Sequence, residues 1–232
     1  REKIIVEAHE EYVSLAEGFI EKAEETLAAI RGKGIGNTMK NRLDEIEGFI
    51  GHARRQMDQI TRRVVKGEVI AHDEKVFSLF EPHTEWISKG KAGVLQELGL
   101  RVGIVEDQYQ FILHHRVMVK ETDDKVAVPM VREVQERFPE FRMCSFDKGY
   151  HSPENRSALG KMLERAILPK KGRLTLEEKA VEGSEEFLRM RRRHSAVESA
   201  INALENHGLD RCPDHGLDGF ERYVALAVLG RN

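Results

Sequence analysis

Cysteine is scarce in this chain of 232 residues, and no long hydrophobic run is present. The two cysteines, Cys144 and Cys212, are too few for a disulfide framework and indicate a reducing compartment, so we expect a cytoplasmic protein. No stretch approaches about eighteen consecutive apolar residues, which excludes a membrane-spanning helix. No signal peptide is visible, but the first residue is Arg1 rather than Met, so we expect a fragment with more chain upstream.

An excess of basic residues is also missing. The chain has 37 Lys and Arg against 40 Asp and Glu, which gives a formal net charge of −3. A compact sequence-specific DNA-binding domain is usually basic as a whole. The composition therefore leaves only local basic patches for contact with nucleic acid, and the many charged residues are otherwise typical of solvated helix faces.

The first seventy residues have a helical pattern. Apolar residues recur at steps of three and four from residue 1 to 30 and again from 39 to 64, which predicts two amphipathic helices. The stretch from Arg31 to Gly36 holds three glycines and ends the first helix. We therefore predict a long antiparallel helical hairpin, residues 1–70, that serves as an accessory region for DNA or subunit contacts.

The pattern changes in residues 71–232. Short apolar runs predict strands, two of them joined by the turn from Glu106 to Gln110, and longer periodic runs between them predict helices. The predicted strands are 75–80, 100–105, 111–117, 141–146 and 166–169, and the predicted helices are 124–138, 153–164 and 176–229, with breaks near 194, 208 and 216. Antiparallel strands followed by strands that alternate with helices predict an α/β fold with one mixed sheet flanked by helices.

Three acidic residues are candidates for chemistry. Asp147 directly follows a predicted strand, at the sheet edge where open α/β sheets place their sites, although a turn aspartate before Gly149 would look the same. Glu198 lies on a late helix, where a surface glutamate with a helical partner is the alternative. Glu81 ends the first predicted strand; Asp107 and Asp73 are alternatives, of which Asp107 suits a hairpin turn better.

Carboxylates from separate elements have a specific use. In-line cleavage or joining of a phosphodiester employs two divalent metals about 3.5–4 Å apart, and Mg²⁺ prefers oxygen ligands. We therefore predict that Glu81, Asp147 and Glu198 converge at one edge of the sheet as catalytic residues and metal ligands.

Basic residues cluster in the C-terminal half and are candidates for contact with DNA phosphates. Acidic residues between 177 and 186 interleave with them, so ordinary solvated charge is the alternative. The candidate DNA contacts are Lys148, Lys170, Lys171, Arg173, Arg191, Arg192 and Arg193.

Several segments together resemble bacterial insertion-sequence transposases of the DDE type. The resemblance covers the chain from about Val69 onward, and the Asp-Lys-Gly-Tyr element at 147–150, followed by a strand and a late Val-Glu helix, is fairly specific in that order. The segments that carry it are 77–86, 145–155, 167–172, 193–202 and 219–228.

This resemblance implies an RNase H-like catalytic core that cleaves transposon ends and transfers them into target DNA. The implied cofactor is Mg²⁺, with Mn²⁺ as a substitute, and the implied partners are the double-stranded terminal repeats, the target DNA and a second subunit in a homodimer associated with the nucleoid. The family's second and third acids fall on Asp147 and Glu198, and its first falls by position on Glu81, where the family normally has Asp. Its end-recognition domain would lie upstream of Arg1.

Two other functions fit the same sequence. The first is a catalytically inactive, transposase-derived DNA-binding protein, which the Glu at position 81 would permit. The second is a helical scaffold without nucleic-acid function, in which the hairpin mediates assembly and the acids are surface charge.

Overall fold

The chain folds into two compact units, residues 1–99 and 100–232. The structure is a computed structural model that describes residues 2–88 and 96–232. No helix within these ranges is long and apolar enough to cross a membrane.

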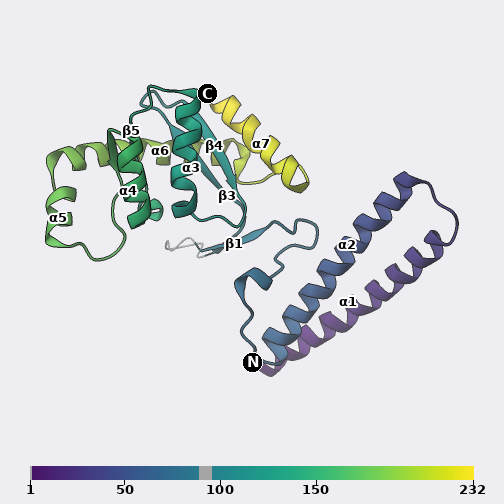
Figure 1. Cartoon of the computed structure of the whole chain (residues 1–232). Helices are drawn as coiled ribbons and strands as arrows, with labels where there is room; N and C mark the ends of the chain where they lie inside the picture. Colours follow the sequence, from purple (N-terminus) through teal and green to yellow (C-terminus); the bar gives the residue numbers. More distant parts are fainter. Residues whose placement is uncertain (1, 89–95) are drawn as a thin grey trace. The chain divides into compact units, whose positions relative to one another are not determined.

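The N-terminal unit begins with the predicted helical hairpin (Figure 1). Helix α1 (Glu2–Arg31) and helix α2 (Asn37–Ile60) run antiparallel, and α2 continues into a π-helical turn, η1 (Thr61–Val65). Gly34 turns the connection with a φ of 69°, a left-handed conformation that favours glycine. The side chains buried in this hairpin follow the predicted helical spacing: Ile20, Leu27, Leu43 and Met57.

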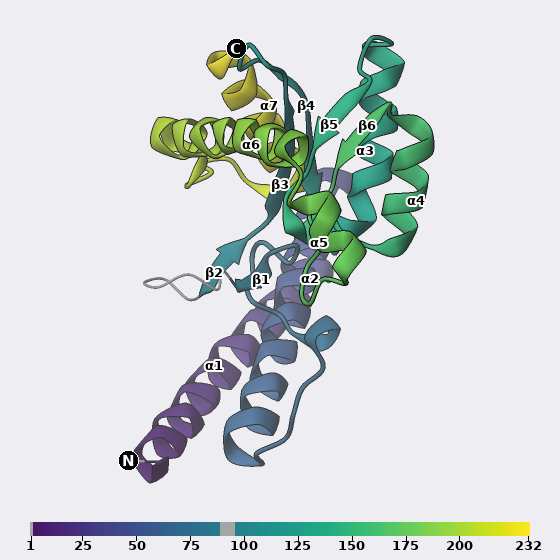
Figure 2. The same ribbon diagram turned by 90° about the vertical axis from the view of Figure 1, so that its left-hand side faces the viewer.

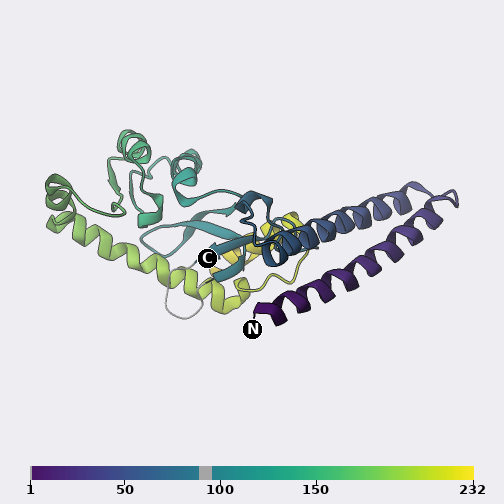
Figure 3. The ribbon, with the colours of Figure 1, turned by 90° about the horizontal axis from the view of Figure 1, so that it is seen from below.

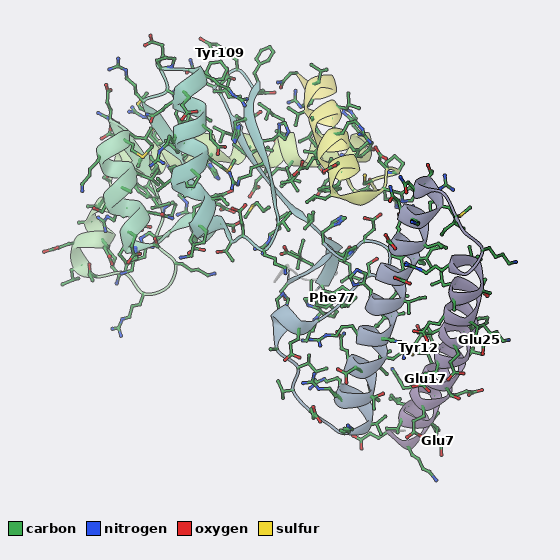
Figure 4. The ribbon with its side chains drawn as sticks, turned by 45° about the vertical axis from the view of Figure 1, so that its right-hand side comes forward. Glu7, Tyr12, Glu17, Glu25, Phe77 and Tyr109 are labelled. Carbon is green, nitrogen blue, oxygen red and sulfur yellow. The ribbon has the colours of Figure 1, made fainter. Side chains whose placement is uncertain are left out.

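Ion pairs on the hairpin surface join α1 to α2. Arg54 donates to Glu24 at 2.7 Å, and Arg31 contacts Asp44 at 2.5 Å and Glu47 at 2.9 Å. Helix α1 itself carries eight acidic and three basic residues, and Figure 4 labels Glu7, Glu17 and Glu25 along it. Such an acidic helix does not attract a phosphate backbone.

The prediction of a strand at residues 75–80 is wrong. Both main-chain polar groups of Val76 bond to the side chain of Gln59 in α2: the Val76 amide donates to Oε1 at 2.8 Å, and Nε2 donates to the Val76 carbonyl at 3.5 Å. A side chain therefore takes the place of a neighbouring strand. The segment instead contains a short 3₁₀ helix, η2 (His72–Glu74), and strand β1 (Glu85–Ser88) comes later, antiparallel to β2 (Gln96–Gly99).

The C-terminal unit follows the predicted order of strands and helices closely (Figure 2). The predicted break near 194 is wrong, because one unbroken helix passes through that position. The elements are β3 (Arg101–Glu106), β4 (Ile112–Met118), α3 (Asp123–Arg137), β5 (Met143–Ser145), η3 (Lys148–Tyr150), α4 (Pro153–Met162), β6 (Arg165–Ile167), α5 (Leu176–Glu182), α6 (Glu185–Leu204), η4 (Glu205–Leu209) and α7 (Gly216–Arg231).

The described strands pair two by two rather than as the one mixed sheet that the order predicted. β3 and β4 form an antiparallel hairpin, with Tyr109 at its tip (Figure 4), and β5 and β6 form a short parallel pair. Side chains of β3 and β5 line a common cavity. The main chains of β3 and β5 do not pair in one ladder.

Helices cover both sides of these strands. α3 and α4 lie on one side and α6 on the other (Figure 3). Five buried residues at helical spacing form the inner face of α3: Val126, Ala127, Met130, Val131 and Val134. Two of them, Ala127 and Val131, pack with Phe146, which follows β5, and with Leu159 of α4 in the main core cluster. The core thus fixes the strand that leads to Asp147.

Candidate active site

A cavity of about 240 Å³ opens in the C-terminal unit between β3, α3, the end of β5 and α6. Four carboxylic residues line it, each from a different element: Glu106, Asp123, Asp147 and Glu198. Two of the three acids that the sequence predicts for the site, Asp147 and Glu198, therefore line the same cavity.

Asp147 stands where the chain leaves the parallel strand pair. The amide of Phe146 donates to the Ile167 carbonyl at 2.9 Å, the last such bond before the chain turns. Asp147 then precedes the 3₁₀ turn η3, which the Tyr150 amide closes onto the Asp147 carbonyl at 3.2 Å. The Asp147 side chain is exposed, so the fold presents this carboxylate to a ligand rather than burying it.

A close approach at Gly149 brings Asp123 to the same turn. A Cβ at position 149 would lie 3.2 Å from Cγ of Asp123 and would overlap its carboxylate. A side chain at position 149 would therefore displace the Asp123 carboxylate from its present place. Asp123 is the first-turn acid of α3, where the positive end of the helix dipole favours a negative charge.

Glu198 reaches the cavity through α6. His194, one helical turn earlier, bonds through Nδ1 to Oγ of Ser145 at 3.1 Å. Ser145 lies two residues before Asp147, so this hydrogen bond ties the strand of one acid to the helix of the other. His194 and Glu198 are four residues apart and share a helix face.

The surroundings of the cavity raise the pKa values of one hydroxyl and one thiol group in its lining. Burial, and then the negative charges of Asp123 and Asp147, together raise the pKa of Tyr150 to about 12. Both carboxylates thus act on one hydroxyl, which stays protonated at neutral pH. Burial likewise raises the pKa of the Cys144 thiol to about 12, so it stays neutral and is a poor metal ligand.

Glu106 differs from the other three acids of the cavity. Burial raises the pKa of its carboxyl group, which the nearby charge of Arg231 opposes. Both Glu106 carboxylate oxygens are buried without a hydrogen-bond partner among the described residues. By contrast, Asp123, Asp147 and Glu198 make no ion pair within the described part of the chain and remain available to a cation.

Glu81 lies in the other unit, and its predicted place at the end of a strand is wrong. It does not end a strand; it begins a turn that the Thr84 amide closes onto the Glu81 carbonyl at 2.9 Å. Its carboxylate lies 3.4 Å from Nε2 of His83, and its amide donates to Oγ of Ser78 at 3.1 Å. A role for Glu81 in metal binding stays a prediction.

The two alternatives to Glu81 also have definite places in the chain. Oδ1 of Asp107 accepts hydrogen bonds from the amides of Tyr109 and Phe111 at 2.8 and 3.0 Å, so it performs the turn chemistry that the sequence suggested. Asp73 belongs to η2, and its side chain is outside the described part of the structure.

The candidate DNA contacts differ in their surroundings. Lys170 is engaged, because its Nζ lies 2.8 Å from both carboxylate oxygens of Glu178. Arg192 is exposed on α6. The remaining five are exposed and form no ion pair with any residue that the structure describes: Lys148, Lys171, Arg173, Arg191 and Arg193.

The sequence reasoning missed Asp123. Its signal was the pair Asp123-Asp124 after Thr122, which looks like an ordinary helix start, since acids favour the first turn of any helix. Its place in the lining of the cavity and its close approach to Gly149 show that it belongs to the site.

Most of the polar groups that line this cavity are oxygen donors, and they suit Mg²⁺ or Mn²⁺. The described residues contain no preformed group of three or more ligating side chains. Mg²⁺ commonly binds one or two carboxylates and completes its shell with water and substrate phosphates. A pair of open carboxylates therefore fits the ion.

Comparison with known proteins gives one match. The model of a family described as Transposase DDE domain matches residues 65–232, more than half of the chain and all of the cavity. Neither a curated protein nor a solved structure matches.

Proposed function

Because the chain belongs to the transposase DDE-domain family, we propose that it catalyses metal-dependent cleavage of transposon ends and their transfer into target DNA. The observation that carries this proposal is that Asp147 and Glu198, from separate elements, line one cavity with no ion-pair partner among the described residues. We assign residues 71–232 to an RNase H-like catalytic region and residues 1–70 to an accessory region.

Asp147 and Glu198 would hold the divalent metal. When bound, Mg²⁺ would activate a water or DNA 3′-hydroxyl as nucleophile and neutralise charge at the phosphate. The chain's own part is to fix the two carboxylates: the 3₁₀ turn holds Asp147, and the Ser145–His194 hydrogen bond holds α6 and hence Glu198.

Two residues compete for the place of a third acid. Glu81 is favoured by the order of acids along the chain. Asp123 is favoured in the DNA-free protein, because it lines the same cavity as Asp147 and Glu198.

The basic residues supply the contacts with DNA in this proposal. Arg191 lies seven residues before Glu198 on α6, which places both near the same face of the helix. Lys171 and Arg173 follow β6 on an exposed segment. Double-stranded terminal repeats and target DNA are the proposed substrates, bound by a homodimer in the nucleoid.

The test is Mn²⁺-dependent nicking of supercoiled plasmid at low salt, where contacts with phosphates are strongest. Asp147→Asn and Glu198→Gln each remove one charge with little change of volume. We expect each to lower nicking by at least ~10²-fold, since each removes a metal ligand. The matched control is Glu177→Gln, which removes the charge of an exposed acid on α5 that does not line the cavity.

The outcomes separate the alternatives. Nicking that survives both substitutions contradicts the assignment of these acids. DNA binding without nicking and without Mn²⁺ binding would identify an inactive, transposase-derived DNA-binding protein. Self-association without DNA binding at low salt would identify a helical scaffold.

A further inference from the structure

Asn155 is a buried polar side chain next to the proposed site, with 7% of its surface exposed. It lies in the first turn of α4, where its amide donates to the capping Oγ of Ser152 at 3.1 Å. Its side-chain nitrogen Nδ2 donates two hydrogen bonds, to the Tyr150 carbonyl at 2.8 Å and to the Asp124 carbonyl at 2.6 Å. One side chain therefore joins the end of the Asp147 turn to the start of α3.

The chemistry of these contacts requires an amide. Both partners are main-chain carbonyls, which only accept hydrogen bonds, so the nitrogen of Asn155 must face them. A primary amide has two N–H donors, and here both are used. An ionised aspartate has the same shape and no donor, so it would face two carbonyls without a bond.

The same two elements also approach each other closely at a second place. Asp123, beside Asp124 in the first turn of α3, packs against Gly149 in the middle of the Asp147 turn. The turn is therefore bonded to α3 through Asn155 at Tyr150 and lies against α3 at Gly149, shortly after the carboxylate of Asp147.

We propose that Asn155 is a positioning residue for Asp147: it anchors the turn of residues 147–150 to the first turn of α3, so that the carboxylates of Asp147 and Asp123 face one cavity before any metal binds. This inference rests on the proposed function, because it concerns the metal affinity of Asp147. Asn155 itself does not touch the metal. The carbonyls that it holds belong to the backbone of both carboxylate-bearing turns.

The experiment measures Mn²⁺ affinity by calorimetry in the DNA-free full chain. The variants are Asn155→Ala, which removes both donors, and Asn155→Asp, which removes them and adds a negative charge. Added charge alone would strengthen cation binding, whereas loss of positioning weakens it in both variants. We expect both to lose about 10- to 100-fold in affinity, as residues that orient metal ligands typically do.

Hydrogen exchange in the metal-free variants provides the second readout. We expect faster exchange at the amides of Tyr150 and His151, which close the turn, with the rest of the unit protected as in the wild type. Asn41→Asp, the same change at an exposed position of α2, controls for charge. If Asn155→Ala fails to fold, Ser152→Ala loosens the same residue more mildly, and we expect it to weaken Mn²⁺ binding in the same direction.

The outcomes distinguish the two claims. If wild-type binding depends on Asp147 and Asn155→Ala binds Mn²⁺ as tightly as the wild type, or Asn155→Asp binds it more tightly, the positioning role is wrong and the proposed function stands. If Mn²⁺ binding does not depend on Asp147, the proposed function fails and the positioning role fails with it.

Discussion

The two units use their carboxylates differently. In the N-terminal unit, Glu24 is paired with Arg54, and Arg31 pairs with two acids of α2. In the C-terminal cavity, Asp123, Asp147 and Glu198 have no ion-pair partner within the described residues, although the same unit pairs Glu178 with Lys170. In the hairpin, these carboxylates form ion pairs that join two helices. In the cavity, these three carboxylates form no ion pair with a described residue.

This difference has a physical meaning. Exposed ion pairs contribute little stability, so those of the hairpin mainly fix which faces of α1 and α2 meet. Unpaired carboxylates around one cavity repel one another, and the fold must hold them there through packing and hydrogen bonds. A cation removes that repulsion, which is why the second arrangement suits binding.

The largest effect is expected in the core that supports the cavity. Leu159 of α4 is fully buried in the cluster that also holds Phe146, and Leu159→Ala should destabilise the C-terminal unit by about 2–5 kcal/mol. Calorimetry should show that this substitution lowers one unfolding transition, while Leu43→Ala in the hairpin lowers another. A single transition shifted equally by both would show that the units do not unfold separately.

The next largest effect is expected on Mn²⁺ affinity, for which one acid from each unit can be compared. Asp123→Asn should weaken Mn²⁺ binding by roughly five- to tenfold, because it removes a negative charge from the cavity. Glu81→Gln should leave the Mn²⁺ affinity of the DNA-free protein unchanged, as measured by calorimetry. If Glu81→Gln weakened Mn²⁺ binding more than Asp123→Asn, Glu81 and not Asp123 would be the third acid of the site.

Two adjacent lysines provide a matched pair for DNA binding. Lys171 is exposed, whereas Lys170 is bound to Glu178. Lys171→Gln should weaken binding to duplex DNA and reduce the slope of log affinity against log salt by about one. Lys170→Gln should change that slope less. Fluorescence anisotropy over a salt series would measure both slopes. Equal slopes for the two variants would contradict the difference proposed between the exposed and the paired lysine.

The smallest effect concerns pH. Hydrogen bonds from Lys170 Nζ, and then from the Thr175 amide, lower the pKa of Glu178 to about 2. A carboxyl group whose pKa falls on folding adds stability above its ordinary pKa, and this stability is lost as the pH falls toward the lowered value. Glu178→Gln should therefore reduce the loss of unfolding temperature between about pH 5 and pH 2, whereas Glu177→Gln should not.

The helices were the most predictable part of the fold. Regular apolar spacing predicted α1, α2, α3 and α4, because burial of one face dictates that spacing. The strand at 75–80 could not be rejected from sequence, since nothing there reveals that Gln59 bonds to Val76. The break near 194 was expected in a polar, basic run, but that run contains no glycine or proline and lies on the exposed surface of one helix.

The candidate site was predictable in part. The order of elements sufficed to bring Asp147 and Glu198 to one cavity, since each follows from its place in the α/β pattern. Asp123 was hidden among ordinary helix-start residues, and Asn155 among the polar residues of a helix cap. Both depend on contacts between segments far apart in sequence, which a local pattern does not encode.

The continuity of α6 has a mechanical consequence. One continuous helix contains both the basic residues from Arg191 to Arg193 and the acidic Glu198. Seven residues of α-helix span about 10 Å, so a phosphate held by Arg191 would be set at a nearly fixed distance from Glu198. The distance between Arg191 and Glu198 would then determine which phosphodiester along the DNA reaches the cavity. A helical segment fixes this distance more narrowly than a flexible loop would.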